Sequence, residues 1–216
     1  NIGQTGQNGI PVIVPLRVKP EYVTDFEVGA RYEAHGFEGS LNGYRENFTN
    51  TFISAPVLVN GSISPLSTTT NGGKSTYQGI ELDAQQSLDT RYGAFSLYGN
   101  ISVNKAYFSS SFSLYPGSPQ VNPGMPLTYR PQHLANIGAG WHLGSWRAEA
   151  NLHYASSQYL PNLITGLASN ITSPGYAVTD FAIRDTVNLG MGMLKNVKLA
   201  LHIDNVFNRH YDVTGF

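Results

Sequence analysis

The strongest constraint on the fold lies between Phe26 and Ala34, where apolar and other residues alternate without a break. One parity carries Phe26, Val28, Ala30, Tyr32 and Ala34, and the other carries Glu27, Arg31 and Glu33. A period of two places these sets on opposite faces of a β-strand. The apolar face must therefore contact either the interior of a soluble protein or lipid.

Seven further segments show the same period. The eight expected strands are Tyr22–Ala34, Phe37 to about Phe52, Thr76–Leu88, Ala94–Ala106, Pro131–Leu143, Trp146–Ala155, Tyr176 to about Asp185 and Val197–Phe207. Soluble strands centre on about 5–6 residues, whereas a tilted strand needs about 9–11 to cross a bilayer. The segment lengths favour the bilayer.

The connections between these segments alternate between short and long. The short ones are His35–Gly36, Asp89–Tyr92, Gly144–Ser145 and a moderate one near Asn188, and the long ones are roughly 54–75, 107–130 and 156–175. Outer-membrane barrels produce this alternation, with short periplasmic turns and long outside loops. A Greek-key sandwich gives no reason for it.

Aromatic residues bracket two of the short turns on the apolar parity. Tyr32 and Phe37 flank the first turn, and Trp141 and Trp146 flank the third. These positions fit an aromatic girdle at a membrane interface. The alternative, that they cap a soluble core, is disfavoured by the strand lengths and the loop alternation.

Charge also favours a membrane barrel. Charged residues are 12% of this chain, against about 25% in soluble domains. Because an Arg at the midplane of a barrel costs about 2–4 kcal/mol, we expect the charged parity to face a water-filled lumen. The expected lumen-lining residues are Glu27, Arg31, Glu81, Asp83, Arg147 and Glu149.

Several kinds of site lack support in the sequence. The chain has no Cys, and a net charge of -1 gives no reason to expect nucleic acid as a partner. The six His residues form no close metal-ligand spacing, and no G-x-S-x-G elbow supports a nucleophile. We therefore predict no catalytic residue, no metal site and no cofactor.

Four segments resemble the carboxy-terminal half of TonB-dependent outer-membrane receptors. They are "VKPEYVTDFEVGARY", "NGGKSTYQGIELDAQQSL", "YRPQHLANIGAGWHL" and "LALHIDNVFNRHYDV", with Asn205, Phe207 and Tyr211 in the family's order in the last. The resemblance implies that residues 1–216 are a carboxy-terminal segment of a transmembrane antiparallel β-barrel. About eight strands, numbers fourteen to twenty-one, would belong to a 22-stranded barrel whose plug domain and last strand are absent here. The chain would stop at Gly215–Phe216 within the last outside loop.

The resemblance also implies a function. The expected protein is a multi-pass receptor of the bacterial outer membrane that takes up a scarce nutrient, above all a ferric siderophore. Its partners would be the lipid bilayer, its own amino-terminal plug and, through the plug, the TonB complex. Two alternatives stay open: a small self-contained barrel acting as an adhesin or anchor, and an outer-membrane enzyme, for which no nucleophile is visible.

A candidate ligand site follows from strand parity. Arg130 and Tyr159 fall on lumen parity at the outer ends of two strands joined by the Gly144–Ser145 hairpin, and Tyr129 and Tyr115 lie in the loop just above. A guanidinium with aromatic neighbours suits an anionic siderophore with flat catecholate or hydroxamate groups. The alternative is that Arg130 neutralises a loop acid and the tyrosines belong to the upper girdle.

Overall fold

A computed structural model describes residues 4–5, 11–12, 18–59, 62–115, 117–162, 165–191 and 194–212. Its eight long strands are β3 (Tyr22–Ala34), β4 (Phe37–Thr49), β7 (Lys74–Thr90), β8 (Gly93–Phe108), β11 (His133–Leu143), β12 (Trp146–Ala155), β15 (Tyr176–Met191) and β16 (Leu194–Ile203). The shorter strands are β1 (Gln4–Thr5), β2 (Pro11–Val12), β5 (Phe52–Val59), β6 (Ser62–Asn71), β9 (Phe112–Ser113), β10 (Gln120–Val121), β13 (Gln158–Pro161) and β14 (Ala168–Ser173). Within these ranges, no helix is long and apolar enough to cross a membrane.

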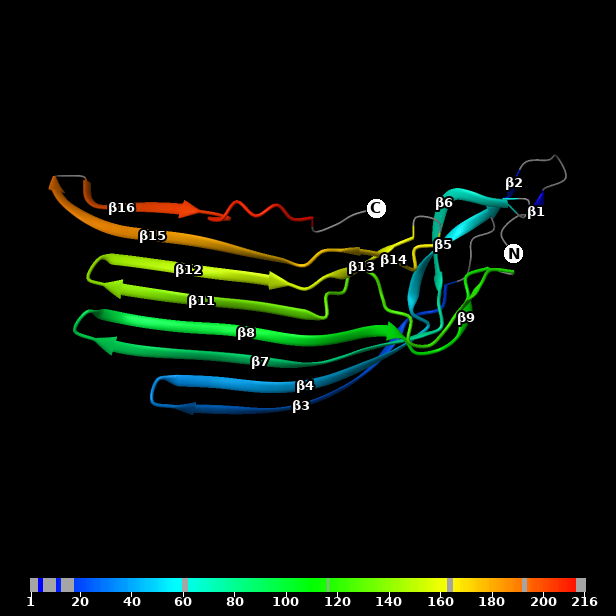
Figure 1. Cartoon of the computed structure of the whole chain (residues 1–216), viewed down its shortest axis with the longest axis horizontal. Coiled ribbons are helices and arrows are strands. Elements are labelled where there is room, and N and C mark those ends of the chain that lie inside the picture. Colours follow the sequence, from blue (N-terminus) through cyan, green and yellow to red (C-terminus); the bar gives the residue numbers. More distant parts are fainter. Residues whose placement is uncertain are drawn as a thin grey trace.

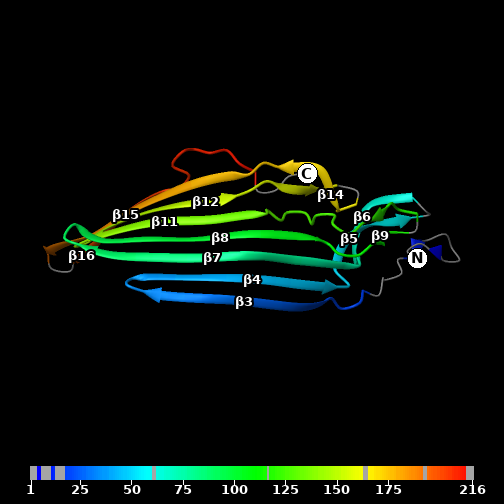
Figure 2. The same ribbon diagram turned by 60° about the horizontal axis from the view of Figure 1, so that its bottom comes forward.

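The long strands form one antiparallel sheet in the order β16-β15-β12-β11-β8-β7-β4-β3. Consecutive long strands are neighbours, so the sheet is an up-and-down meander (Figure 1). The hairpin turns lie together at one end, and the short strands cluster at the opposite end, which we call the loop end. Figure 2 shows the same separation from a second direction.

The short turns contain residues whose backbone suits tight hairpins. His35 and Gly36 have φ of 52° and 77°, as a type I′ turn requires, and Gly144 has φ of 61°. At Gly36 an added Cβ would lie 2.7 Å from the carbonyl oxygen of Ser87 on the neighbouring strand. Glycine is therefore needed there for both conformation and space.

Most of the expected strands are confirmed, with corrections at their ends. The second strand ends at Thr49 rather than near Phe52, because Asn50 takes a φ of 59° and Phe52 opens the separate β5–β6 hairpin. The seventh strand continues past Asp185 to Met191, so Asn188 lies within β15 rather than in a connection.

The last expected strand is shifted towards the amino terminus. It begins at Leu194 rather than Val197 and ends at Ile203, well before Phe207. Positive φ angles at Asn205 (51°) and Asn208 (50°) end the extended conformation after β16. Gly215 and Phe216 lie outside the described residues.

The long connections are not structureless. Their two-stranded sheets pair β5 with β6, β9 with β10 and β13 with β14. The buried apolar side chains gather largely at this loop end, among them Phe108, Val121 and Leu160, and Phe108 meets Phe112 edge-on at 5.0 Å. The small core of the described residues thus lies mainly in the loop-end hairpins and in the adjoining ends of the long strands.

The long sheet has an apolar and a polar face, as cross-strand register shows. One row of directly paired residues on the apolar face runs through Ala30, Leu41, Leu82, Ile101, Ala135, Tyr154 and Ala177. One row on the polar face runs through Arg31, Ser40, Asp83, Asn100, Asn136 and His153. Large apolar side chains stay exposed on the first face, with Val28 at 77% and Ile80 at 57%.

Candidate functional site

The polar face carries all six residues expected to line a lumen. Arg31 and Asp83 lie in the polar row described above, and Glu27 and Glu81 occupy the same parity of β3 and β7. Arg147 and Glu149 follow the parity of His153 along β12. The six charges therefore project from one side of the sheet, opposite the exposed apolar residues.

Several of these charges have polar partners on neighbouring strands. The guanidinium of Arg31 contacts the carboxylate of Glu38, and Glu38 also accepts a hydrogen bond of 2.6 Å from Gln85 Nε2. Arg184 Nη1 lies 3.2 Å from Glu149 Oε1. These pairs are solvent-exposed, so they orient the side chains more than they stabilise the sheet.

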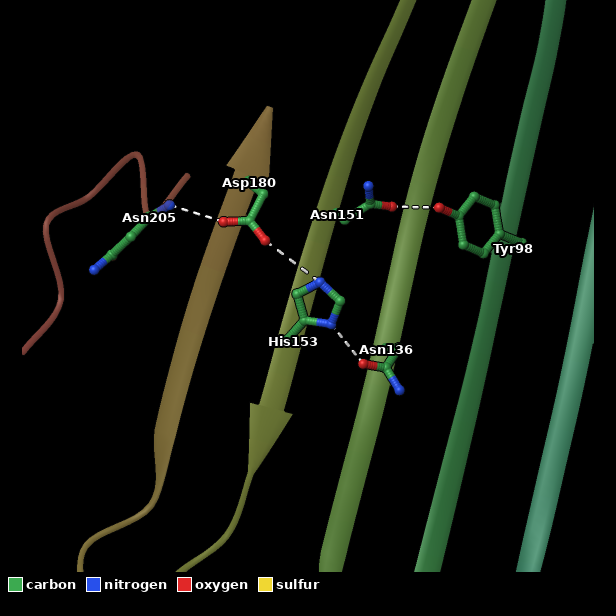
Figure 3. Close-up of polar contacts among 6 residues, drawn as sticks. All are labelled: Tyr98, Asn136, Asn151, His153, Asp180 and Asn205. Atoms are coloured by element: carbon green, nitrogen blue, oxygen red, sulfur yellow. Dashed lines mark hydrogen bonds and ion pairs between the residues drawn. The ribbon is translucent and has the colours of Figure 1, made fainter. Parts of the chain in front are cut away.

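A longer polar network crosses the sheet nearer the loop end (Figure 3). His153 Nδ1 lies 2.6 Å from Asn136 Oδ1, and Asn136 Nδ2 donates to Asn100 Oδ1 at 2.8 Å. On its other side, His153 Nε2 lies 3.4 Å from Asp180 Oδ2, while Asp180 Oδ1 accepts a 2.7 Å bond from the Asn205 amide. The network joins β8, β11, β12, β15 and the segment after β16.

The hydrogen-bond roles in this network follow from Asn136. Its amide nitrogen donates to Asn100, so its oxygen is the acceptor that faces His153. The Nδ1 atom of His153 then carries a proton. Its Nε2 atom donates to the Asp180 carboxylate when the imidazole is doubly protonated, and the two form an ion pair in that state.

Two tyrosines on the polar face each reach across a glycine to an asparagine two strands away. Tyr98 donates to Asn151 across Gly138, as Figure 3 shows for the two side chains. Tyr44 donates to Asn104 at 2.8 Å across Gly79. A Cβ at Gly138 would lie 2.2 Å from Tyr98 Cζ, so the glycine makes room for the ring.

At the loop end, Arg130 stacks on an aromatic residue that sequence reasoning did not select. Its guanidinium lies 5.7 Å from the ring centroid of Tyr77, and Tyr77 meets Phe48 edge-on at 5.2 Å. Tyr77 and Phe48 both follow the polar parity of their strands. Counting back in twos from Glu81 would have placed Tyr77 on that face.

Three of the four residues predicted to bind ligand are connected through the backbone. Tyr129 precedes Arg130 in the chain, and its amide donates to the carbonyl oxygen of Tyr159 at 3.0 Å. Tyr129 takes a φ of 54°, which is uncommon for a bulky residue and marks a constrained turn. Tyr115 lies in a different turn, where its amide donates to Ser118 Oγ at 3.3 Å.

The segment after β16 adds aromatic and polar groups beside His153 and Asp180. Tyr211 stacks on Tyr176 with ring centroids 4.5 Å apart, and Ser173 Oγ donates to the Asp212 carbonyl at 3.1 Å. Together with His153, Asp180 and Asn205, Tyr176 and Tyr211 line a pocket on the polar face. In the part of the chain that the structure describes, no cluster of three or more His, Asp or Glu could hold a metal ion.

Comparison with known proteins gives a consistent family. Residues 2–206 match the profile described as "TonB dependent receptor-like, beta-barrel". The pesticin receptor of Yersinia enterocolitica is 24% identical over 222 residues, which cover 98% of this chain and 28% of that receptor. The chain therefore spans under a third of the length of this curated relative.

Solved structures agree with the fold. The siderophore receptor PiuA from Acinetobacter baumannii superposes with a TM-score of 0.66 at 18% identity, over 91% of this chain and 26% of that one. The copper transporter OprC superposes with a TM-score of 0.65 at 19% identity, over 92% of this chain and 28% of that one. At these identities the likeness establishes the architecture, an antiparallel sheet that matches part of such a barrel.

Proposed function

This chain belongs to the TonB-dependent receptor family of the bacterial outer membrane, and from that membership we propose that it forms part of an active-transport receptor for a ferric siderophore. Members of this family are transporters and not enzymes. Membership favours this function over a self-contained adhesin barrel. It also agrees with the absence of a nucleophile motif from the sequence.

In this proposal the eight long strands are a carboxy-terminal part of a larger barrel. Among the described strands, β3 and β16 form the two edges of the sheet, and in lipid the outer backbone N–H and C=O groups of these edges need hydrogen bonds from further strands. The apolar face meets the bilayer, and the polar face lines the lumen around the plug. The pocket beside Arg31, Asp83 and Tyr98 offers polar groups to a plug that couples to TonB.

The observation that carries the cargo assignment is the stacking of Arg130 on Tyr77. The ring of Tyr77 orients the guanidinium of Arg130. Because Arg130 is exposed, its guanidinium stays open to a ligand. A cation over the ring of Tyr77, which Phe48 meets edge-on, suits an anionic complex with flat chelating groups. Tyr159, 37% exposed and linked to Tyr129, supplies a further ring at the same end of the sheet.

The test replaces Arg130 and Tyr159 together by Ala in the complete receptor. Binding of ferric catecholate and ferric hydroxamate complexes to whole cells is then measured, with cupric ion as a separate probe. We expect at least a tenfold loss of affinity for one of the ferric complexes. Unchanged siderophore binding by a correctly folded barrel, or binding of cupric ion alone, would overturn the cargo assignment.

The control uses a second arginine–tyrosine pair in the same sheet. Arg91 stacks on Tyr92 with its guanidinium carbon 4.5 Å from the ring centroid, in the turn between β7 and β8 at the opposite end. Replacing Arg91 and Tyr92 by Ala removes the same chemical groups far from the candidate site. This variant should bind the ferric complexes as the unmodified receptor does.

A further inference from the structure

Two basic residues interrupt the apolar face near the loop end. Arg45 on β4 and Lys105 on β8 are both exposed and are each paired in register with Gln78 on the strand between them. The next residues of that parity towards the hairpin turns include Ile80 and Val103, so the three lie on the apolar face. We call Arg45, Gln78 and Lys105 the basic row.

The basic row lies where the outer edge of the bilayer would be. On β8, Lys105 lies ten positions from Phe95, whose register partner Trp141 belongs to the aromatic residues near the hairpin turns. Ten residues of a strand tilted by 35–45° rise by roughly 23–28 Å, close to the apolar band of about 25 Å in outer-membrane barrels. Leu97, Gly99, Ile101 and Val103 fill that interval on the apolar parity.

The charges of the basic row have no acidic partner in the described part of the chain. Among the described residues, neither Arg45 nor Lys105 forms an ion pair. Each cation is nevertheless oriented: Arg45 Nε donates to Asn47 Oδ1 at 3.2 Å, and Lys105 Nζ lies 5.3 Å from the ring centroid of Tyr107. A groove on this face is lined by both cations and by Phe26, Val28, Gln78 and Ile80.

We propose that the basic row binds the phosphate groups of glycolipid headgroups in the outer leaflet of the outer membrane. The apolar part of the groove would hold the upper acyl chain, and the two cations, with backbones about 10 Å apart, can reach one headgroup. Arg and Lys bind phosphate through charge-assisted hydrogen bonds, and the Gln78 amide adds a neutral donor. Such cations stay at the headgroup depth because moving them inward is costly.

The test uses the complete receptor in detergent and the double variant Arg45→Gln with Lys105→Gln. Affinity for a bisphosphorylated lipid A is measured by fluorescence titration, alongside a lipid A from which both phosphates have been removed. Each cation near a lipid surface contributes about a fivefold change in affinity, so the double variant should bind the phosphorylated lipid about thirtyfold more weakly. Both proteins should bind the dephosphorylated lipid equally.

Matched variants separate this effect from loss of charge or loss of fold. Arg147→Gln with Lys198→Gln removes one Arg and one Lys from the polar face and should leave lipid binding unchanged. Arg45→Lys with Lys105→Arg keeps both charges and should retain affinity within a few fold. Equal binding of phosphorylated lipid by the Gln double variant, an equal loss in the polar-face control, or competition by millimolar inorganic phosphate would overturn the proposal.

Discussion

His153 and Asp180 lie on the neighbouring strands β12 and β15, with ring Nε2 3.4 Å from carboxylate Oδ2. The other carboxylate oxygen of Asp180 accepts the amide of Asn205, whose side chain in turn bonds the backbone of Arg209 at both its amide and its carbonyl. One carboxylate therefore ties a strand-to-strand polar network to the segment that leaves β16. This relationship gives the first prediction.

Asp180→Ala should loosen residues 205–209, whereas Asp180→Asn should not. Alanine removes the acceptor of the Asn205 amide, but asparagine keeps an oxygen at that position while it removes the charge facing His153. Hydrogen exchange measured on the complete receptor should be faster in this segment for the Ala variant alone. If exchange in this segment were instead equally accelerated in both variants, the ion pair with His153, rather than the hydrogen bond, would order the segment.

Gly138→Ala should destabilise the barrel, although Ala usually suits a strand better than Gly. The new Cβ would lie 2.2 Å from Tyr98 Cζ and 2.5 Å from Asn151 Oδ1, so the ring must move and its hydrogen bond is lost. We expect the free energy of unfolding to fall by about 1 kcal/mol. Gly43→Ala is the matched control, because its nearest atom, the Val28 carbonyl oxygen, would be 3.9 Å away and the change should be neutral or stabilising.

A charge should be tolerated on one face of β8 and not on the other. Ile101→Arg places a guanidinium near the middle of the apolar interval and should lower the free energy of unfolding in lipid vesicles by about 2–4 kcal/mol. The neighbouring Ser102→Arg points to the polar face and should cost much less. The reverse order of these two costs would mean that the faces are assigned to lipid and lumen the wrong way round.

The sequence predicts the long sheet well, because its strands follow one rule throughout. A period of two, with most of the charges on one parity, defines the two faces from Tyr22 to Ala155, and the structure keeps these faces in register across β3 to β12. The loop-end hairpins do not follow this rule. Strand β5 contains a Pro and shifts register between Pro56 and Leu58, so the alternation of its two faces is broken.

The contacts of the candidate site were harder to predict than its faces. Parity predicted that Arg130 and His153 lie on the polar side, but it did not identify the residues that contact them. Tyr77 meets Arg130 because the loop before β11 folds back, with the Leu127 amide bonded to Ala106. Asp180 meets His153 through cross-strand register, and Asn205 reaches Asp180 because the chain turns after Ile203. Such contacts depend on tertiary geometry, which strand periodicity does not encode.

The last prediction concerns the contact between Arg130 and Tyr77. Tyr77→Phe keeps the aromatic face under the guanidinium, so ferric-siderophore affinity should stay within about twofold of the unmodified receptor. Tyr77→Leu removes that face, and an exposed cation–π contact is worth about 0.5–1 kcal/mol, so affinity should fall about two- to fivefold. In the Arg130→Ala background, Tyr77→Leu should have little further effect if the ring acts by positioning the guanidinium. A full additional loss in that background would instead mean that the Tyr77 ring contacts the cargo independently of Arg130.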